Sequence, residues 1–148
     1  MGECGRILGL DVGDVRIGVA VSDALGMMAH PKETIQCVSL RKDVGAVGRV
    51  VEETGSVRVV VGLPLSQDGS ENAQSRKSVK FAEALREALG VPVELVDERF
   101  TTAIARRSMS DMGVKRDKRK GIVDQIAAQQ LLQTYLDRSA HQGNQTRA

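Results

Sequence analysis

The sequence predicts an α/β domain built on a mixed five-stranded sheet with helices on both faces. Two observations predict this class. Adjacent apolar strands separated by a glycine turn open the chain, and apolar runs then alternate with helical patterns. Three antiparallel strands followed by strand–helix–strand crossovers give such a sheet. The length of 148 residues favours one compact domain.

The first half of the chain is expected to form an antiparallel meander and then a helix. Its three strands are expected at residues 6–11, 15–22 and 32–35. Gly13-Asp14 is a turn signal between the first two strands. Residues 41–54 carry valines at helical spacing, and Gly55 follows them as a stop, so a helix is expected there.

The second half is expected to alternate strands and helices. Residues 57–64, "VRVVVGLP", form a continuous β-branched run of the kind buried on both faces of a sheet. The remaining elements are expected as a helix at 71–89, a strand at 91–97, a helix from about Thr101, and a last helix at 121–138 after a break at "GVKRDKRKG". We expect residues 1–138 to form the folded domain and residues 139–148 to form a polar C-terminal tail.

Composition excludes several classes of protein. Aromatic residues make up only 2% of the chain, which argues against stacking platforms for single-stranded bases. Cys4 and Cys37 lack the spacing of metal ligands, and a reduced cytoplasmic compartment is the simpler expectation. No apolar run has transmembrane length, and no signal-peptide core precedes the first strand, so no membrane association is expected.

Carboxylates stand at three places where a core would ordinarily be apolar. Asp11 ends the first strand, and Asp97 and Glu98 end the last one. Ligands bind outside the carboxyl ends of parallel strands in open α/β sheets. Asp124 lies on the last helix, in line with residues expected to face the sheet. Acids gathered at one edge repel one another, and divalent cations such as Mg²⁺ remove that cost. Two such ions about 4 Å apart can promote phosphodiester hydrolysis.

Structural explanations exist for each acid taken alone. Asp11 is compatible with a turn former, and Asp124 with an acid favoured at a helix N-terminus. Glu98 is compatible with a surface ion pair to Arg99. Asp97 is an alternative to Glu98, because alternation along a strand sends the two to opposite faces.

Four stretches stand in a characteristic order along the chain: "RILGLDVGDVRIGVAVSD", "VVVGLPLSQDGS", "VDERFTT" and "KGIVDQIAAQQLL". Together they resemble the YqgF (RuvX-like) family, from Arg6 to about Leu136. Members of this family are bacterial RNase H-like proteins, described as Holliday junction resolvases and as nucleases that mature the 5′ end of pre-16S ribosomal RNA.

The resemblance implies an RNase H-like fold and a set of site residues. It assigns catalysis and metal binding to Asp11, Glu98 and Asp124, with Mg²⁺ or Mn²⁺ as cofactor. Arg16 matches a basic position of the family's first hairpin. Many relatives have a small hydroxyl residue or a lysine where Asp14 stands here, so an extra acid lies near the expected site.

Basic residues crowd the segment between Glu98 and Asp124. They are Arg99, Arg106, Arg107, Lys115, Arg116, Lys118, Arg119 and Lys120. With Arg16, they are the candidate nucleic-acid-binding residues, because a phosphate backbone is their natural counter-charge. In the loop "GLPLSQDGSENAQS", Ser70 is a candidate cap of the following helix, whose N-terminus could receive a phosphate.

These expectations lead to a metal-dependent endonuclease acting in 5′ maturation of pre-16S rRNA during ribosome biogenesis. Structured RNA is the first choice of substrate and branched DNA the second, with pre-ribosomal particles as candidate partners. One alternative is a Holliday junction resolvase, which would need a dimer; the chain is expected to be a monomer or a weak homodimer. Another is a non-catalytic RNA-binding factor in ribosome assembly. An ATP-dependent phosphotransferase is disfavoured, because such enzymes need two domains of this sheet type.

Overall fold

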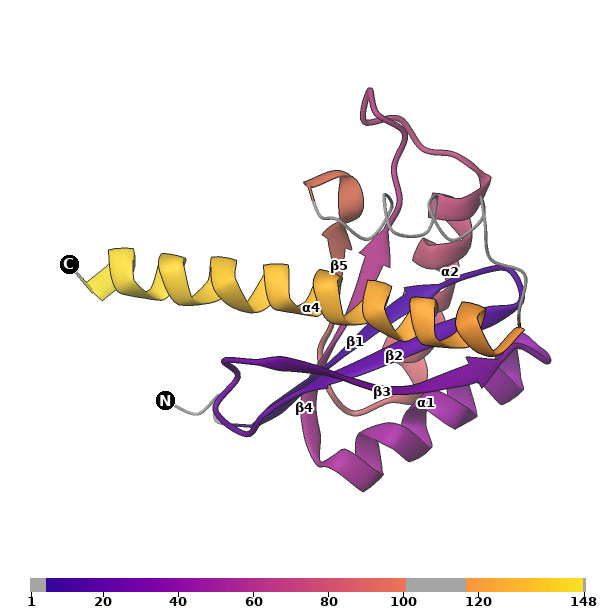
Figure 1. Cartoon of the computed structure of the whole chain (residues 1–148), viewed down its shortest axis with the longest axis horizontal. Helices are drawn as coiled ribbons and strands as arrows, with labels where there is room; N and C mark the ends of the chain where they lie inside the picture. Colours follow the sequence, from indigo (N-terminus) through magenta and orange to yellow (C-terminus); the bar gives the residue numbers. More distant parts are fainter. Residues whose placement is uncertain (1–4, 101–116, 148) are drawn as a thin grey trace.

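A mixed five-stranded sheet forms the centre of the computed structural model, which describes residues 5–100 and 117–147 (Figure 1). The strands are β1 (Arg6–Val12), β2 (Arg16–Ser22), β3 (Ala29–Gln36), β4 (Ser56–Leu63) and β5 (Val93–Asp97). Their order across the sheet is β3-β2-β1-β4-β5. β1 is antiparallel to β2 and parallel to β4, and β4 is parallel to β5. The predicted fold class is therefore confirmed.

Helices cover both faces of this sheet. They are α1 (Leu40–Thr54), α2 (Ala73–Ala88) and α4 (Asp117–Arg147), and the short 3₁₀ turn η1 (Glu98–Phe100) follows β5. Figure 1 shows α4 crossing one face, with α1 and α2 behind the sheet. The buried apolar residues form two clusters, one on each face of the sheet. Leu8 and Leu10 of β1 pack with valines of α1 and with Phe81 of α2, whereas Leu131 and Leu132 of α4 pack with Val60 of β4.

Local sequence explains the ends of α1 and α2. The Ser39 side chain accepts a hydrogen bond from the N–H of Lys42 at the start of α1, and Gly55 ends that helix in the left-handed region, at φ 70°. Asn72 begins α2 through a reciprocal capping box with Ser75. Ser70 was expected as this cap, which is wrong.

The last helix differs most from the sequence-based expectation. It runs from Asp117 to Arg147 rather than over 121–138. Lysine and arginine are good helix formers, so the charge at 118–120 does not break the helix. Residues 139–147 contain no proline to end it. The helix expected from about Thr101 falls outside the described residues. Within the part of the chain that the structure describes, no helix has the length and apolar character to cross a membrane.

Candidate active site

Asp11 lies near the carboxyl end of the central strand, β1, on the face of the sheet that α4 covers. Its side chain is buried, with 3% exposed. A Cβ atom built on Gly9 would meet the Leu132 side chain of α4 at 2.9 Å. Side chains two residues apart in a strand point to the same face, so Asp11 also faces α4. Asp11 lies within β1 and is buried, so the alternative explanation of it as a turn former is wrong.

Asp124 is brought beside Asp11 by a glycine on β2. Asp11 and Gly18 lie directly opposite each other in the antiparallel β1–β2 pair. A Cβ atom on Gly18 would overlap the backbone carbonyl of Asp124, so α4 rests on the sheet at this glycine. Directly opposed positions in such a pair have Cβ atoms about 5 Å apart. The backbone of Asp124 therefore lies over the position next to Asp11.

Glu98 approaches from the other side through a second glycine. Leu10 is paired with Val61 in the parallel β1–β4 pair, so the next residues, Asp11 and Gly62, lie side by side. A Cβ atom on Gly62 would lie 2.5 Å from Oε2 of Glu98. Glu98 is 1% exposed. This burial makes the surface ion pair considered for Glu98 wrong.

The three acids thus share one face at the carboxyl edge of the sheet, with Asp11 between the other two. They do not form a closed chelate as their side chains lie. Oδ2 of Asp124 accepts a hydrogen bond from Nε of Arg16 at 3.0 Å, and both side chains are 19% exposed. Among the residues described, no group of three or more His, Cys, Asp or Glu side chains is arranged to hold a metal ion. The donor set is nevertheless the one that a divalent cation prefers, because all three side chains are carboxylates.

Asp97, the alternative to Glu98, has a different role. Nε and Nη2 of Arg99 donate to its Oδ2 at 3.0 and 2.8 Å. These hydrogen bonds from Arg99 hold the pKa of the Asp97 carboxyl below its usual value. Nη1 of Arg99 also donates to the Gln67 carbonyl at 3.4 Å. Arg99 therefore ties the turn that carries Glu98 to the loop between β4 and α2.

The expected nucleic-acid-binding residues fall into three groups. Arg16 pairs with Asp124 and Arg99 with Asp97. The helix α4 includes Lys118, Arg119 and Lys120 in its first turn. The other four, Arg106, Arg107, Lys115 and Arg116, lie outside the described residues.

Sequence reasoning missed Gly18 and Gly62, the two glycines that make room for the acids. A signal was present, because each glycine interrupts a strand rich in valine and isoleucine, in "RIGVAVS" and "VVVGL". Glycine inside a strand weakens it and often marks the close approach of another backbone or of a ligand.

Comparison with known proteins agrees with this architecture. Residues 5–138 match the model of the RuvX family, described as Holliday junction resolvase. A protein of Myxococcus xanthus named "Putative pre-16S rRNA nuclease" is 46% identical over 132 residues, which cover 89% of this chain and 87% of the relative. A protein of Clostridioides difficile with the same name is 43% identical, with 90% and 94% covered.

Solved structures show the same fold at low identity. Thermus thermophilus RuvC, in complex with a Holliday junction substrate, superposes with a TM-score of 0.51 at 18% identity, covering 91% of this chain and 96% of that one. The Fowlpox virus resolvase superposes with a TM-score of 0.53 at 11% identity, covering 89% and 97%. The match of the family model over residues 5–138, with relatives above 40% identity, confirms the resemblance seen in the sequence: the chain belongs to the RuvX family of nucleases, which are phosphodiester hydrolases.

Proposed function

We propose that this protein is an endonuclease dependent on divalent metal ions and that it cleaves structured RNA in the 5′ maturation of pre-16S rRNA. The observation that carries the proposal is the position of Asp11 between two strand glycines. Asp124 covers Gly18 and Glu98 covers Gly62. A fold gains nothing from burying acids side by side, since each buried carboxylate costs several kcal/mol unless a cation or donor meets it.

Asp11, Glu98 and Asp124 would hold the metal, which is Mg²⁺ or Mn²⁺ by the chemistry of its ligands. When bound, divalent cations in such a site supply activation of water and charge stabilisation at the phosphate. The chain itself supplies the placement of the acids. The sheet fixes Asp11, η1 fixes Glu98, and α4 fixes Asp124. Arg16 balances the charge of Asp124 and is the described cation best placed to meet a phosphate at this edge.

Two considerations support a nucleic acid as substrate, and the first of them favours RNA. Curated relatives that are 40–46% identical carry the name of a pre-16S rRNA nuclease. The basic residues Lys118, Arg119 and Lys120 precede Asp124 by one to two helical turns, where they can follow a phosphate backbone to the site. The family description and the solved resolvases favour branched DNA as the second candidate.

The test combines cleavage with binding. Purified protein is incubated with a pre-16S rRNA fragment and with a four-way DNA junction, each with Mg²⁺, with Mn²⁺ and with EDTA. The variants Asp11→Asn, Glu98→Gln and Asp124→Asn are expected to lose cleavage in both metals while they still bind RNA in EDTA. Asp137→Asn is the matched control, because it removes an exposed carboxylate from the same helix as Asp124.

The outcomes separate the candidate functions. Cleavage that survives in Asp124→Asn contradicts the mechanism. Cleavage of the junction alone favours the resolvase. RNA binding without cleavage by the unaltered protein favours an assembly factor. Metal binding is tested without the reaction by measuring the melting temperature of the protein at increasing concentrations of Mn²⁺. Mn²⁺ is expected to raise the melting temperature of the control variant and not that of the three site variants.

The basic turn of α4 has its own test. Substitution of Lys118, Arg119 and Lys120 by glutamine is expected to make the binding constant less dependent on salt. The slope of its logarithm against the logarithm of the salt concentration is expected to become less negative by about 0.7 for each lost contact to single-stranded RNA. An unchanged slope contradicts a role of this turn in binding the backbone.

A further inference from the structure

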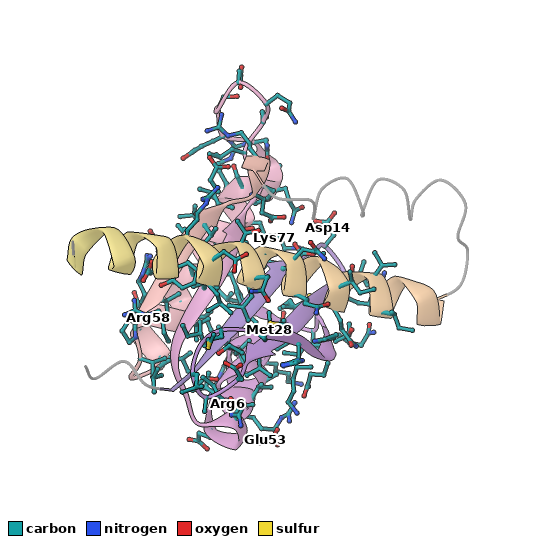
Figure 2. The ribbon with its side chains drawn as sticks, turned by 60° about the vertical axis from the view of Figure 1, so that its left-hand side comes forward. Arg6, Asp14, Met28, Glu53, Arg58 and Lys77 are labelled. Carbon is teal, nitrogen blue, oxygen red and sulfur yellow. The ribbon has the colours of Figure 1, made fainter. Side chains whose placement is uncertain are left out.

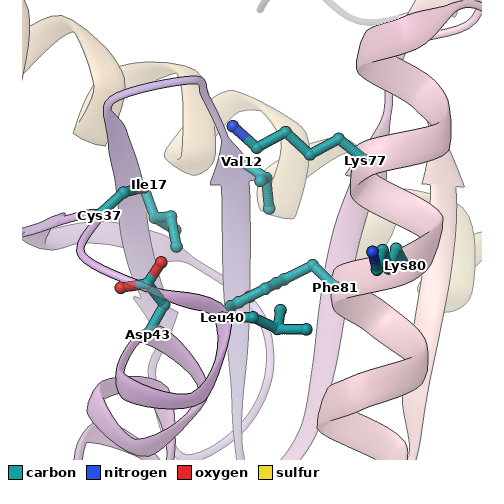
Figure 3. A pocket seen from close by; sticks show the side chains of 8 residues that line it. All are labelled: Val12, Ile17, Cys37, Leu40, Asp43, Lys77, Lys80 and Phe81. Atoms are coloured by element: carbon teal, nitrogen blue, oxygen red, sulfur yellow. The ribbon is translucent and has the colours of Figure 1, made fainter.

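A second concave site lies on the opposite face of the sheet from the acids, between α1 and α2. It is a cavity of about 240 Å³ with a mostly apolar wall. Its lining residues are Val12, Ile17, Cys37, Leu40, Asp43, Lys77, Lys80 and Phe81 (Figure 3). This volume is small beside a site for a drug-sized ligand, and it suits one planar ring system.

One carboxylate lies within this apolar wall. Asp43 is 8% exposed and lines the cavity, and Figure 3 shows its carboxylate on the side of Ile17 and Cys37. Its Oδ1 accepts the backbone N–H of Val38 at 2.9 Å. In the described part of the chain this carboxylate has no other side-chain hydrogen bond or ion pair, although an ionised carboxylate has about four lone-pair sites. Acceptor capacity therefore remains inside the cavity. The neighbouring Cys37 is a poor competitor for that role, because burial and then the charge of Asp43 raise the pKa of its thiol.

Positive charge and apolar side chains surround the opening. Lys77 reaches the tip of the β1–β2 hairpin, where its Nζ lies 3.4 Å from Oδ1 of Asp14 (Figure 2). Lys80 is exposed on the same helix. Val15 and Val38 are 59% and 68% exposed beside the opening, at the hairpin tip and before α1. The rim therefore offers ammonium groups for phosphate around a site that is apolar within.

The cavity and the acidic site are joined through β1. Val12 lines the cavity and directly follows Asp11. Consecutive residues of a strand point to opposite faces, so the two sites lie back to back at the carboxyl end of one strand. A polynucleotide that passes over the Gly13–Val15 turn can reach both sites at once.

We propose that this cavity receives one unpaired base of the nucleic acid, and that it prefers guanine. The proposal rests on the proposed nuclease function. Guanine presents two adjacent N–H donors on its pairing edge, which suit a carboxylate acceptor, whereas uracil presents one donor between two acceptors. Unpaired RNA bases are commonly recognised by stacking on aromatic or apolar side chains and by hydrogen bonds to this edge. Phe81 and Leu40 supply the apolar walls, Asp43 the acceptor, and Lys77 and Lys80 the phosphate contacts.

The experiment measures binding in EDTA, so that it does not depend on cleavage or on the acidic site. Three seven-nucleotide RNAs are compared: oligouridine, the same RNA with one central guanosine, and the same RNA with inosine there. Inosine lacks the 2-amino group. The unaltered protein is expected to bind the guanosine RNA about tenfold more tightly than oligouridine, with inosine between them, since a hydrogen bond to a charged acceptor is of that strength.

Two variants test the cavity directly. Asp43→Asn keeps an oxygen for the Val38 N–H and replaces the other acceptor with an amide, and it is expected to abolish the preference for guanosine. Leu40→Trp is the second variant, for the case that Asp43→Asn does not fold. It fills the rim of the cavity with a larger side chain and is also expected to abolish the preference for guanosine. Lys80→Gln is expected to weaken the binding of all three RNAs by a similar factor. Lys32→Gln changes an exposed lysine of β3 that does not line the cavity, and it is expected to weaken none of them by as much.

The results that overturn the proposal are distinct from failure of the nuclease assignment. Equal binding of the three RNAs by the unaltered protein overturns it, as does a guanosine preference that persists in both folded cavity variants. The preference, measured in EDTA, is expected to survive in Asp11→Asn, which is expected to lose cleavage and metal binding.

Discussion

The glycines that flank Asp11 allow the most direct test of the site geometry. Alanine at Gly18 places a methyl group into the backbone carbonyl of Asp124, and a helix backbone cannot move aside as a flexible side chain can. Overpacking of this kind costs about 1–3 kcal/mol, and we expect a value near the upper end. For a domain of this size, that lowers the melting temperature by about 5–10 °C.

Alanine at Gly62 is expected to separate stability from activity. Its methyl group meets the end of the Glu98 side chain and, at 3.0 Å, a methyl group of Leu131. Both can shift, so we expect a loss near 1 kcal/mol. Displacement of a reacting group by about 1 Å can nevertheless cost about 100-fold in rate.

Urea denaturation and cleavage of a pre-16S rRNA fragment measure the two effects. Gly45→Ala is the matched control, because nothing lies within 4 Å of its added methyl group. Gly45 lies inside α1, where alanine is favoured by about 0.5–1 kcal/mol, so a small increase in stability is expected. If the Gly18→Ala variant unfolds at the same urea concentration as the unaltered protein, the close contact of α4 with the sheet at Gly18 is refuted. Full activity of Gly62→Ala would refute the role of Glu98.

Three further perturbations follow from individual contacts. A double-mutant cycle of Arg16→Gln and Asp124→Asn, followed by urea denaturation, is expected to give a coupling energy of about 1–2 kcal/mol, because the pair is mostly buried; a value near zero contradicts the pairing. The pKa of Asp97 is lowered by Arg99 from its ordinary 3.8, so its contribution to stability is complete above about pH 5 and is lost as pH falls below about pH 4. Unfolding free energies of Asp97→Asn and the unaltered protein are thus expected to converge at low pH, and a constant difference down to pH 3 would exclude this linkage. Asn72→Ala is expected to cost about 1 kcal/mol by removing the cap of α2, and an unchanged midpoint of denaturation contradicts the capping box.

The elements that the sequence predicts well are those in which the local pattern and the tertiary environment agree. The run "VRVVVGLP" contains four β-branched valines, and β4 is mostly buried between β1 and β5. The start of β3 was predicted less well. Its first half, "AHPK", has neither alternation nor β-branched residues, and its pairing with β2 makes it a strand. Tertiary pairing of this kind is not visible in a local pattern.

The sequence likewise predicts one part of the candidate site and not the rest. Topology predicts that Asp11 and Glu98 reach the same edge, because β1 and β5 are both parallel to β4. Sequence could not choose between Asp97 and Glu98. The structure separates them at the end of β5. Asp97, the last residue of β5, binds Arg99, whereas Glu98, the first residue of η1, is buried over Gly62. Nor could the sequence pair Arg16 with Asp124, since 108 positions separate them and only the seating of α4 on β2 brings them together.

The features that weaken this fold are concentrated at one edge. Glycines interrupt β2 and β4 at the positions that flank Asp11, and two carboxylates are almost completely buried there. Away from that edge, the described buried positions of β1, β4 and α4 are leucine, valine and alanine, apart from Gly9 and Ser56. Natural sequences depart from such local consistency chiefly at functional sites. Without a functional constraint, glycines in strands and buried carboxylates would occur at unrelated positions of the sheet, and selection for stability would remove them. Their coincidence around Asp11, on one face and from four separate elements, is therefore an argument for chemistry at this edge that does not depend on the resemblance to any known nuclease.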